Sequence, residues 1–306
     1  MNLREWALPV YTILIHLATG GLIALWLIRW RFSRVGEKEM DRLMRVPILI
    51  LFSTIALAIV GAHFHLSKPF LSFLAVTNFA HSWLSREITV TVLFFITTGM
   101  LTLLTWFVEG RAKLKTILGW LAILFGLFTV YCMARVYLLP TQIVWNSTMT
   151  ILTYFVETVL VGSTSLIAIL LMDLNFRYEQ DPNGVEHQDR VVKSSLKDLA
   201  FAMVVALLAN LALNIDQIVS LSSTQNESAQ MSLKLLSDLY QPLFLFRIVL
   251  GVLGVSWFLI SYFQNSKHKS QVRQLVVPAY IACTLVLVGE VLGRFLFYAI
   301  HVRIGI

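Results

Sequence analysis

The sequence predicts an all-α polytopic membrane protein with eight transmembrane helices. Hydrophobic residues make up 58% of the 306 residues, charged residues only 13%, and the mean hydropathy is +0.76. These values lie far from the averages of soluble domains. Eight segments also reach the roughly 20 apolar residues that an α-helix needs to cross a bilayer, and basic residues gather in alternate loops. The whole chain, 1–306, is therefore expected to be a single integral membrane domain without a soluble catalytic domain.

The eight expected spans follow one another along the chain at residues 7–28, 46–65, 88–108, 114–137, 149–172, 199–219, 242–263 and 275–301. The first is too long for the apolar part of a typical signal peptide and lacks a small-x-small cleavage site, so we expect it to be retained. The connection 66–86 is rich in Phe and Trp, which predicts that it lies against the membrane surface or covers another part of the protein. In the polar loop 220–237, the second half is expected to form a short surface helix.

The most polar stretch lies at 175–197 and contains Pro182, Asn183 and Gly184, which are typical turn residues. We interpret it as a cytoplasmic linker between two sets of four spans. The expected division is 1–174 for the first four-helix set, 175–198 for the linker, and 199–306 for the second set.

The basic residues predict the orientation of the chain. Sixteen Lys and Arg residues lie in the first, third, fifth and seventh loops, against five on the other side, where both termini lie. By the positive-inside rule both termini are outside, in the periplasm, and an even number of spans agrees with this. Because the net charge of +7 is spread over alternate helix ends, it does not indicate binding of nucleic acid.

The last span carries four polar side chains on one narrow stripe. At about 100° per residue, Glu290, Arg294, Tyr298 and His301 fall at roughly 0°, 40°, 80° and 20° around the helix. A charge at the centre of a bilayer costs about 2.5 to 3.5 kcal/mol on insertion scales, so this stripe should face protein or a cofactor. A structural ion pair between Glu290 and Arg294 is the alternative explanation.

The predicted orientation places the ionisable residues of the spans in the outer half, and none of comparable kind in the inner half. The outer residues are His16, His63, His65, Glu87, Arg135, Glu157, Asp216, Arg247, Glu290, Arg294 and His301. This distribution argues against a proton pump or ion-coupled transporter, which needs polar groups near both faces. It also argues against a pair of haems at two depths, while a single haem stays open. Cys132 and Cys283 are isolated and are expected to be packing residues that hold no iron–sulfur cluster.

A pocket of carboxylates, imidazoles and arginines that opens to the outer leaflet suits a lipid-soluble quinol. Oxidation of a quinol releases two protons and two electrons, so the site needs a base and fixed hydrogen-bond donors. We expect His65 and Glu87 to accept protons, and Arg135 or Arg294 to act as donors. Other outer residues have structural alternatives, as interfacial side chains, helix-packing residues or partners for each other: His63, His81, His16, Arg247 and Asp216.

Several runs of this sequence resemble a known family. They are E-W-A-L-P-V-Y-T at 5–12, H-L-S-K-P at 65–69, S-R-E-I at 85–88, R-V-Y at 135–137, and G-E-V-L-G-R-F-L-F-Y-A-I-H at 289–301. Together they resemble the membrane anchor subunit of dimethyl sulfoxide reductase, the DmsC family, from the first span to the last. Ser67 departs from the Gly that is common at this position in the family, which puts the backbone geometry beside His65 in question. The charged linker is also longer than expected.

The resemblance implies an eight-helix subunit in the bacterial inner membrane that contains no haem and no iron–sulfur cluster of its own. It implies binding of menaquinol, and anchoring of two extrinsic subunits, a four-cluster iron–sulfur protein and a molybdopterin catalytic protein, in anaerobic respiration. Family knowledge of the quinol site carries over to His65 and, less directly, to Glu87.

Our leading expectation is thus a quinol-oxidising anchor whose pocket includes Arg135, Glu290, Arg294, Tyr298 and His301. Electrons would leave directly to a cluster docked on the outer side, and the partner subunit would carry out the terminal reduction. The alternatives are a small-solute transporter or channel without a redox role, and a purely structural anchor.

Overall fold

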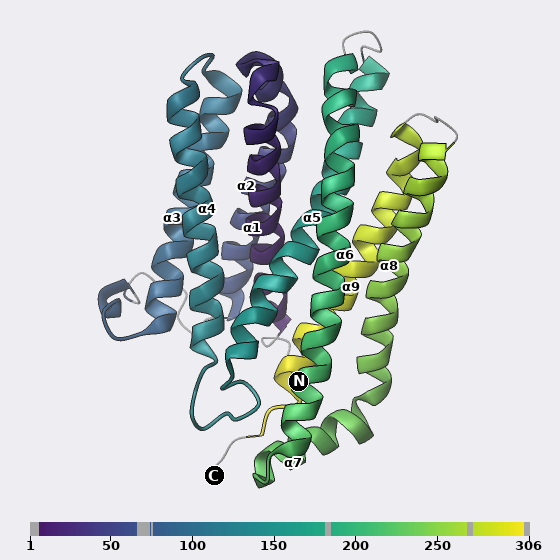
Figure 1. The fold of residues 1–306 in the computed structure, drawn as a ribbon. Helices are drawn as coiled ribbons and strands as arrows, with labels where there is room; N and C mark the ends of the chain where they lie inside the picture. Colours follow the sequence, from purple (N-terminus) through teal and green to yellow (C-terminus); the bar gives the residue numbers. More distant parts are fainter. Residues whose placement is uncertain (1–5, 66–73, 75, 181–184, 268–271, 303–306) are drawn as a thin grey trace.

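The described part of the chain is almost entirely helical. The computed structural model describes residues 6–65, 74, 76–180, 185–267 and 272–302, and these contain no β-strand (Figure 1). Eight of the helices are long and apolar enough to cross a membrane, which confirms the predicted fold class. These eight are α1 (Ala7–Arg31), α2 (Glu37–His65), α3 (Trp83–Phe107), α4 (Ala112–Val136), α5 (Thr148–Gln180), α6 (Glu186–Ser223), α8 (Gln241–Lys267) and α9 (Val276–Ala299).

Shorter helical segments among the described residues include η2 (Ser33–Val35), α7 (Glu227–Lys234), η5 (Leu235–Leu239) and η6 (Val272–Leu275). The helix α7 is preceded by Asn226, whose side chain accepts a hydrogen bond from the backbone N–H of Ser228 and so caps the first turn. It confirms the short helix expected in the second half of the loop 220–237.

The eight long helices pack as two groups of four. In Figure 1, α1 to α4 lie on one side, and α5, α6, α8 and α9 lie on the other. The groups meet mainly where α1 packs against α5. The boundary between them therefore falls between α4 and α5, at residues 137–147. The expected boundary at 175–198 has five of the eight expected spans before it and three after it, so it does not separate two sets of four.

The polar stretch at 175–198 is largely helical because its charges are spaced for pairing along a helix. Among its ion pairs, Arg190 binds Glu186 at 3.2 Å and Lys193 binds Asp189 at 2.6 Å, each one helical turn apart. The helix α5 extends to Gln180 and α6 begins at Glu186, so the stretch joins two neighbouring helices of the second group. The turn residues Pro182, Asn183 and Gly184 lie outside the described residues.

A close crossing of α1 and α5 holds the two groups together. A Cβ atom added at Gly162 would collide with the backbone of Gly20 and Gly21, and a Cβ atom at Gly20 would collide with the carbonyl oxygen of Thr158. In membranes, small residues at helix interfaces let backbones approach closely, because association there depends on packing. This crossing fixes the height and rotation of α1 against α5.

We therefore expect Gly162→Val to destabilise the protein by about 1 to 3 kcal/mol, the usual range for overpacking a tight interface. Thermal unfolding of the purified membrane complex measures this effect. The matched control is Gly61→Val in α2, where nothing lies within 4 Å of an added Cβ atom. Equal melting temperatures for the two variants would show that the crossing does not constrain the fold.

Buried charges also occur at the other end of the bundle, which corrects one expectation. Lys115 of α4 is fully buried, and its Nζ atom lies 2.5 Å from Asp41 Oδ2 of α2. Asp41 also binds Arg29 of α1 at 2.9 Å. Lys115 is one of the three basic residues counted in the third loop, although the expected span 114–137 includes it. The helix α4 begins at Ala112, so this lysine faces the neighbouring helices. Buried charges thus occur at both ends, and at this end they tie α1, α2 and α4 together.

Candidate functional site

Most of the residues that the sequence singled out lie at the end of the bundle where α1 begins and α9 ends (Figure 1). Glu87 lies near the start of α3, Arg135 in the last turn of α4, and Arg294 and Tyr298 near the end of α9. His65 is the last residue of α2 and its backbone reaches the same end, but its side chain lies outside the described part. These residues divide between the two helix groups.

Glu87 occupies a buried place between α1 and α3. It is 8% exposed, and the Tyr11 side chain of α1 lies beside its carboxyl group. The Tyr11 hydroxyl is 3.2 Å from the Thr91 hydroxyl, which in turn donates to the Glu87 carbonyl oxygen at 2.8 Å. None of the ion pairs among the described residues includes Glu87. The phenol of Tyr11 is therefore the polar side chain beside this carboxylate, and no cation is paired with it in the described chain.

Arg135 lies on the aromatic face of Trp83 at the edge of this first group. Its guanidinium carbon is 4.7 Å from the centre of the Trp83 ring, and that of Arg86 is 4.2 Å from the same ring. Cation–π contacts of this kind stabilise by about 0.5 to 2 kcal/mol. The buried Nε atom of Arg135 has no hydrogen-bond partner in the described chain, so the guanidinium keeps one donor for a further group.

Tyr298 and His301 belong to an aromatic cluster that joins the two helix groups. The hydroxyls of Tyr298 and Tyr137 are 2.6 Å apart, which links α9 to the end of α4. The His301 ring stacks on Trp145 with 4.7 Å between ring centres, and its Nδ1 atom contacts the Tyr298 carbonyl oxygen. Both residues face protein, as the stripe predicted. Their partners come from α4 and the following connection.

Arg294 forms an ion pair with Glu157 of α5 and is only 1% exposed. Its guanidinium carbon also lies 3.6 Å from the centre of the Tyr154 ring. On the other side of Glu157, the Nδ1 atom of His16 is 3.6 Å from the carboxylate oxygen Oε2. His16 is fully buried, and neither of its ring nitrogens has a hydrogen-bond partner among the described residues. An acid, a base and an imidazole are therefore in contact.

Glu290 does not pair with Arg294, so the proposed ion pair between them is wrong. The Asn210 amide of α6 lies 3.5 Å from Glu290 Oε1, while Arg294 turns to α5. Arg247 donates to Asn214 and forms no ion pair with Asp216. The stripe residues of α9 spread over about 80° of the helix surface, so they face different neighbours. Arg294 faces α5, Glu290 faces α6, and Tyr298 faces Tyr137 at the end of α4.

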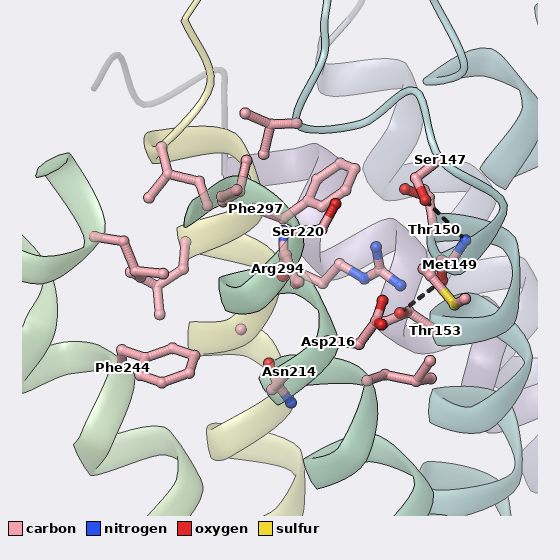
Figure 2. Close-up of a pocket in the computed structure, with 18 of the residues that line it drawn as sticks. Ser147, Met149, Thr150, Thr153, Asn214, Asp216, Ser220, Phe244, Arg294 and Phe297 are labelled. Atoms are coloured by element: carbon pink, nitrogen blue, oxygen red, sulfur yellow. Dashed lines mark hydrogen bonds between the residues drawn. The ribbon is translucent and has the colours of Figure 1, made fainter. Parts of the chain in front are cut away.

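A cavity of about 100 Å³ opens between α5, α6, α8 and α9 at this end. Figure 2 shows the Arg294 side chain reaching across it from α9, with Asp216 and Asn214 of α6 and Thr153 of α5 around it. Glu157 and Tyr154 are buried residues of the lining, and Asp216 is an exposed one. Glu87, Arg135, Glu290, Tyr298 and His301 do not line this cavity. The residues expected to form one pocket therefore lie in two neighbouring sites. One surrounds Glu87 and Arg135 in the first helix group, and the other is the cavity beside Arg294 and Glu157.

Sequence reasoning missed Tyr11, Tyr154 and Asn210 as members of these places. The pair Asn210 and Asn214, four residues apart in an apolar span, was a visible signal, because amides inside a membrane helix require partners. The two tyrosines gave no such signal, since tyrosine is common in membrane helices. Among the described residues, no three His, Cys, Asp or Glu side chains are arranged to hold a metal ion.

Comparison with known protein families finds a match over almost the whole chain. Residues 1–300 match the family model described as DMSO reductase anchor subunit (DmsC). Among curated proteins, the anaerobic dimethyl sulfoxide reductase subunit YnfH of Escherichia coli is 28% identical over 99% of this sequence and 96% of its own length. The C subunit of anaerobic dimethyl sulfoxide reductase is 26% identical in Escherichia coli, over 99% and 96% of the two sequences, and 24% identical in Haemophilus influenzae, over 100% and 98%.

Proposed function

This chain belongs to the DMSO reductase anchor subunit family, and from this premise we propose that it binds menaquinol and oxidises it. The site of oxidation is the end of the helix bundle where α1 begins and α9 ends, which we call the polar end. It is a multi-pass protein of the bacterial inner membrane, and an anchor subunit implies catalytic and electron-transfer partners. In our proposal these are a four-cluster iron–sulfur subunit and a molybdopterin subunit. The terminal reduction takes place in the molybdopterin subunit.

The observation that carries this proposal is the environment of Glu87. A buried carboxylate that has a phenol beside it and no ion-pair partner in the described chain is suited to take up a proton, since no cation holds its charge. Menaquinol releases two protons and two electrons when it is oxidised. Glu87 accepts a proton there, and His65 at the end of α2 accepts the other.

Arg135 orients the head group. Its guanidinium is permanently charged, it is held against Trp83, and its Nε donor is unused within the described chain. A donor fixed in this way holds an acceptor oxygen in one place without loss of side-chain entropy at binding. Arg294 is already paired with Glu157 and contributes to the neighbouring cavity.

The electrons pass to a cluster of the iron–sulfur subunit, which docks at the polar end. We place this end on the periplasmic side, because the sixteen basic residues of the alternate loops lie at the other end. In this arrangement, proton release and electron transfer occur near one membrane face.

The substitution Glu87→Gln tests this proposal. We expect the rate of substrate reduction with a menaquinol analogue to fall about a hundredfold, the low end for loss of a general base. Reduction with an artificial dye, which bypasses the anchor, stays at the wild-type rate. The matched control is Glu109→Gln, an exposed carboxylate just beyond the other end of α3. Quinol-linked turnover by the Glu87 variant at the control's rate would refute the role of Glu87.

A further inference from the structure

We propose that the cavity between α5, α6, α8 and α9 is a hydrated proton route that joins the buried Glu157 to the surface at Asp216. The inference rests on the proposed function, because the protons come from the oxidised quinol. It concerns residues of the second helix group, whereas the quinol and its proton acceptor Glu87 belong to the first.

The size of the cavity favours water over a ring. About 100 Å³ is less than the roughly 150 Å³ of an engineered cavity that binds benzene, whereas one water needs only about 10 to 15 Å³ of such space. Room for several waters therefore exists, and a naphthoquinone head group is too large for this volume. Asp216 is an exposed residue of the lining, so the cavity reaches the surface of the protein beside it.

The walls offer the partners that such waters require. Hydroxyls of Thr150, Thr153 and Ser220 line the cavity. The Tyr154 hydroxyl and the Arg294 Nε atom also belong to lining residues, are buried, and have no partner within the described chain. A buried polar atom without a hydrogen bond costs about 1 to 3 kcal/mol. A water that reaches either atom would remove this cost.

The charges around Glu157 come from several neighbouring helices. His16 faces it from α1, Tyr154 lies one turn away on α5, Arg247 lies on α8, and Arg294 and Glu290 lie on α9. The two guanidinium groups balance the two carboxylates, so this cluster has no large net charge. Because its ion pair with Arg294 favours the charged form, Glu157 serves the route as a hydrogen-bond acceptor for the waters and does not store the proton.

Phenols lie near Glu87 and near Glu157, and waters have to bridge them. Tyr11 lies beside Glu87, and the Tyr137 and Tyr298 hydroxyls are 2.6 Å apart. The ring centres of Tyr137 and Tyr154 are 6.2 Å apart, and the Tyr154 hydroxyl has no hydrogen-bond partner among the described residues. Each phenol can accept one proton and donate another, so in our proposal these hydroxyls and the waters between them pass on a proton from Glu87, which returns to its charged form. Both electrons leave separately to the docked iron–sulfur cluster.

The sharpest test is Tyr154→Phe, which removes a hydroxyl that has no partner in the described protein. A purely structural tyrosine predicts unchanged or higher stability and an unchanged rate. We expect unchanged stability but quinol-linked turnover about tenfold slower, less than the roughly hundredfold effect of losing a directly acting base. We also expect a larger ratio of the rates in H₂O and D₂O. The matched control Tyr262→Phe, near the far end of α8, keeps wild-type values.

A second variant tests the mouth of the route. Asp216 is exposed and forms no ion pair among the described residues, so Asp216→Asn should fold normally. It should slow quinol-linked turnover in the same direction and raise the isotope ratio. Wild-type rates and isotope ratios in both variants would overturn the proton route.

The proton route can be refuted without refuting the proposed function. If the wild-type complex oxidises the quinol and Glu87→Gln does not, quinol oxidation stands even when Tyr154→Phe and Asp216→Asn behave as wild type. If the wild-type complex does not oxidise the quinol, the proposed function itself fails.

Discussion

The substitution His65→Arg is expected to abolish menaquinol-dependent reduction and to leave dye-dependent reduction intact. His65 ends α2 at the polar end of the bundle, and it matches the histidine of the H-L-x-x-P run that the family resemblance connects with the quinol site. Histidine binds and releases a proton near neutral pH, whereas arginine stays charged and can only donate. Loss of such a group slows proton transfer by about 10² to 10⁴.

The control for this experiment lies two residues earlier. His63 is exposed in the same last turns of α2, and its Nδ1 atom lies 2.7 Å from the Ile59 carbonyl oxygen. The variant His63→Arg introduces the same charge at the same helix end, and it should retain most of the quinol-linked rate. Normal quinol turnover in His65→Arg would remove this residue from the proposed site. A loss in both variants would indicate a general effect of charge.

The second large effect concerns stability. Removal of one partner of the Glu157–Arg294 pair leaves a buried charge without its counter-ion, which costs about 3 to 5 kcal/mol. We expect Glu157→Gln to cost more than Arg294→Met. A lone carboxyl group can become neutral by taking up a proton, whereas a guanidinium group cannot lose its charge. Thermal unfolding of the purified complex ranks the two variants.

The double variant Glu157→Gln with Arg294→Met completes a cycle. Because no unpaired charge remains, it should be more stable than Glu157→Gln alone, with a coupling energy of about 0.5 to 3 kcal/mol. Additive effects of the two single substitutions would show that the ion pair contributes little. The exposed pair Arg190 and Glu186 provides a comparison, since exposed pairs contribute about 1 kcal/mol or less.

Much of the fold follows from the sequence by a local argument. Each span must satisfy its backbone hydrogen bonds inside the bilayer, so about 20 apolar residues in a row predict a helix wherever they occur. The expected spans and the observed long helices agree in number and order. Helix ends were less predictable. Lys115 is fully buried although a charge close to a helix end reads as a loop residue, because Asp41 and Glu37 of α2 bind its ammonium group.

The partners of the polar residues could not be read from the sequence. Glu290 and Arg294 are one turn apart on α9, and the stripe made them look like a pair. The rotation of α9 instead turns Arg294 to Glu157 and leaves Glu290 to Asn210. The rotation of a helix about its axis depends on how its whole length packs against other helices. The sequence of a single span does not specify this rotation.

By itself, therefore, the sequence determined how many helices cross the membrane, which residues are costly to bury, and which family the protein resembles, because each of these depends on local composition or motif. Only the tertiary structure decided that the costly residues form two neighbouring places. The close approach of Gly20 and Gly162 brings α1 against α5 and sets His16 beside Glu157. That contact joins residues 141 positions apart (157 − 16 = 141), and only helix packing can bring them together.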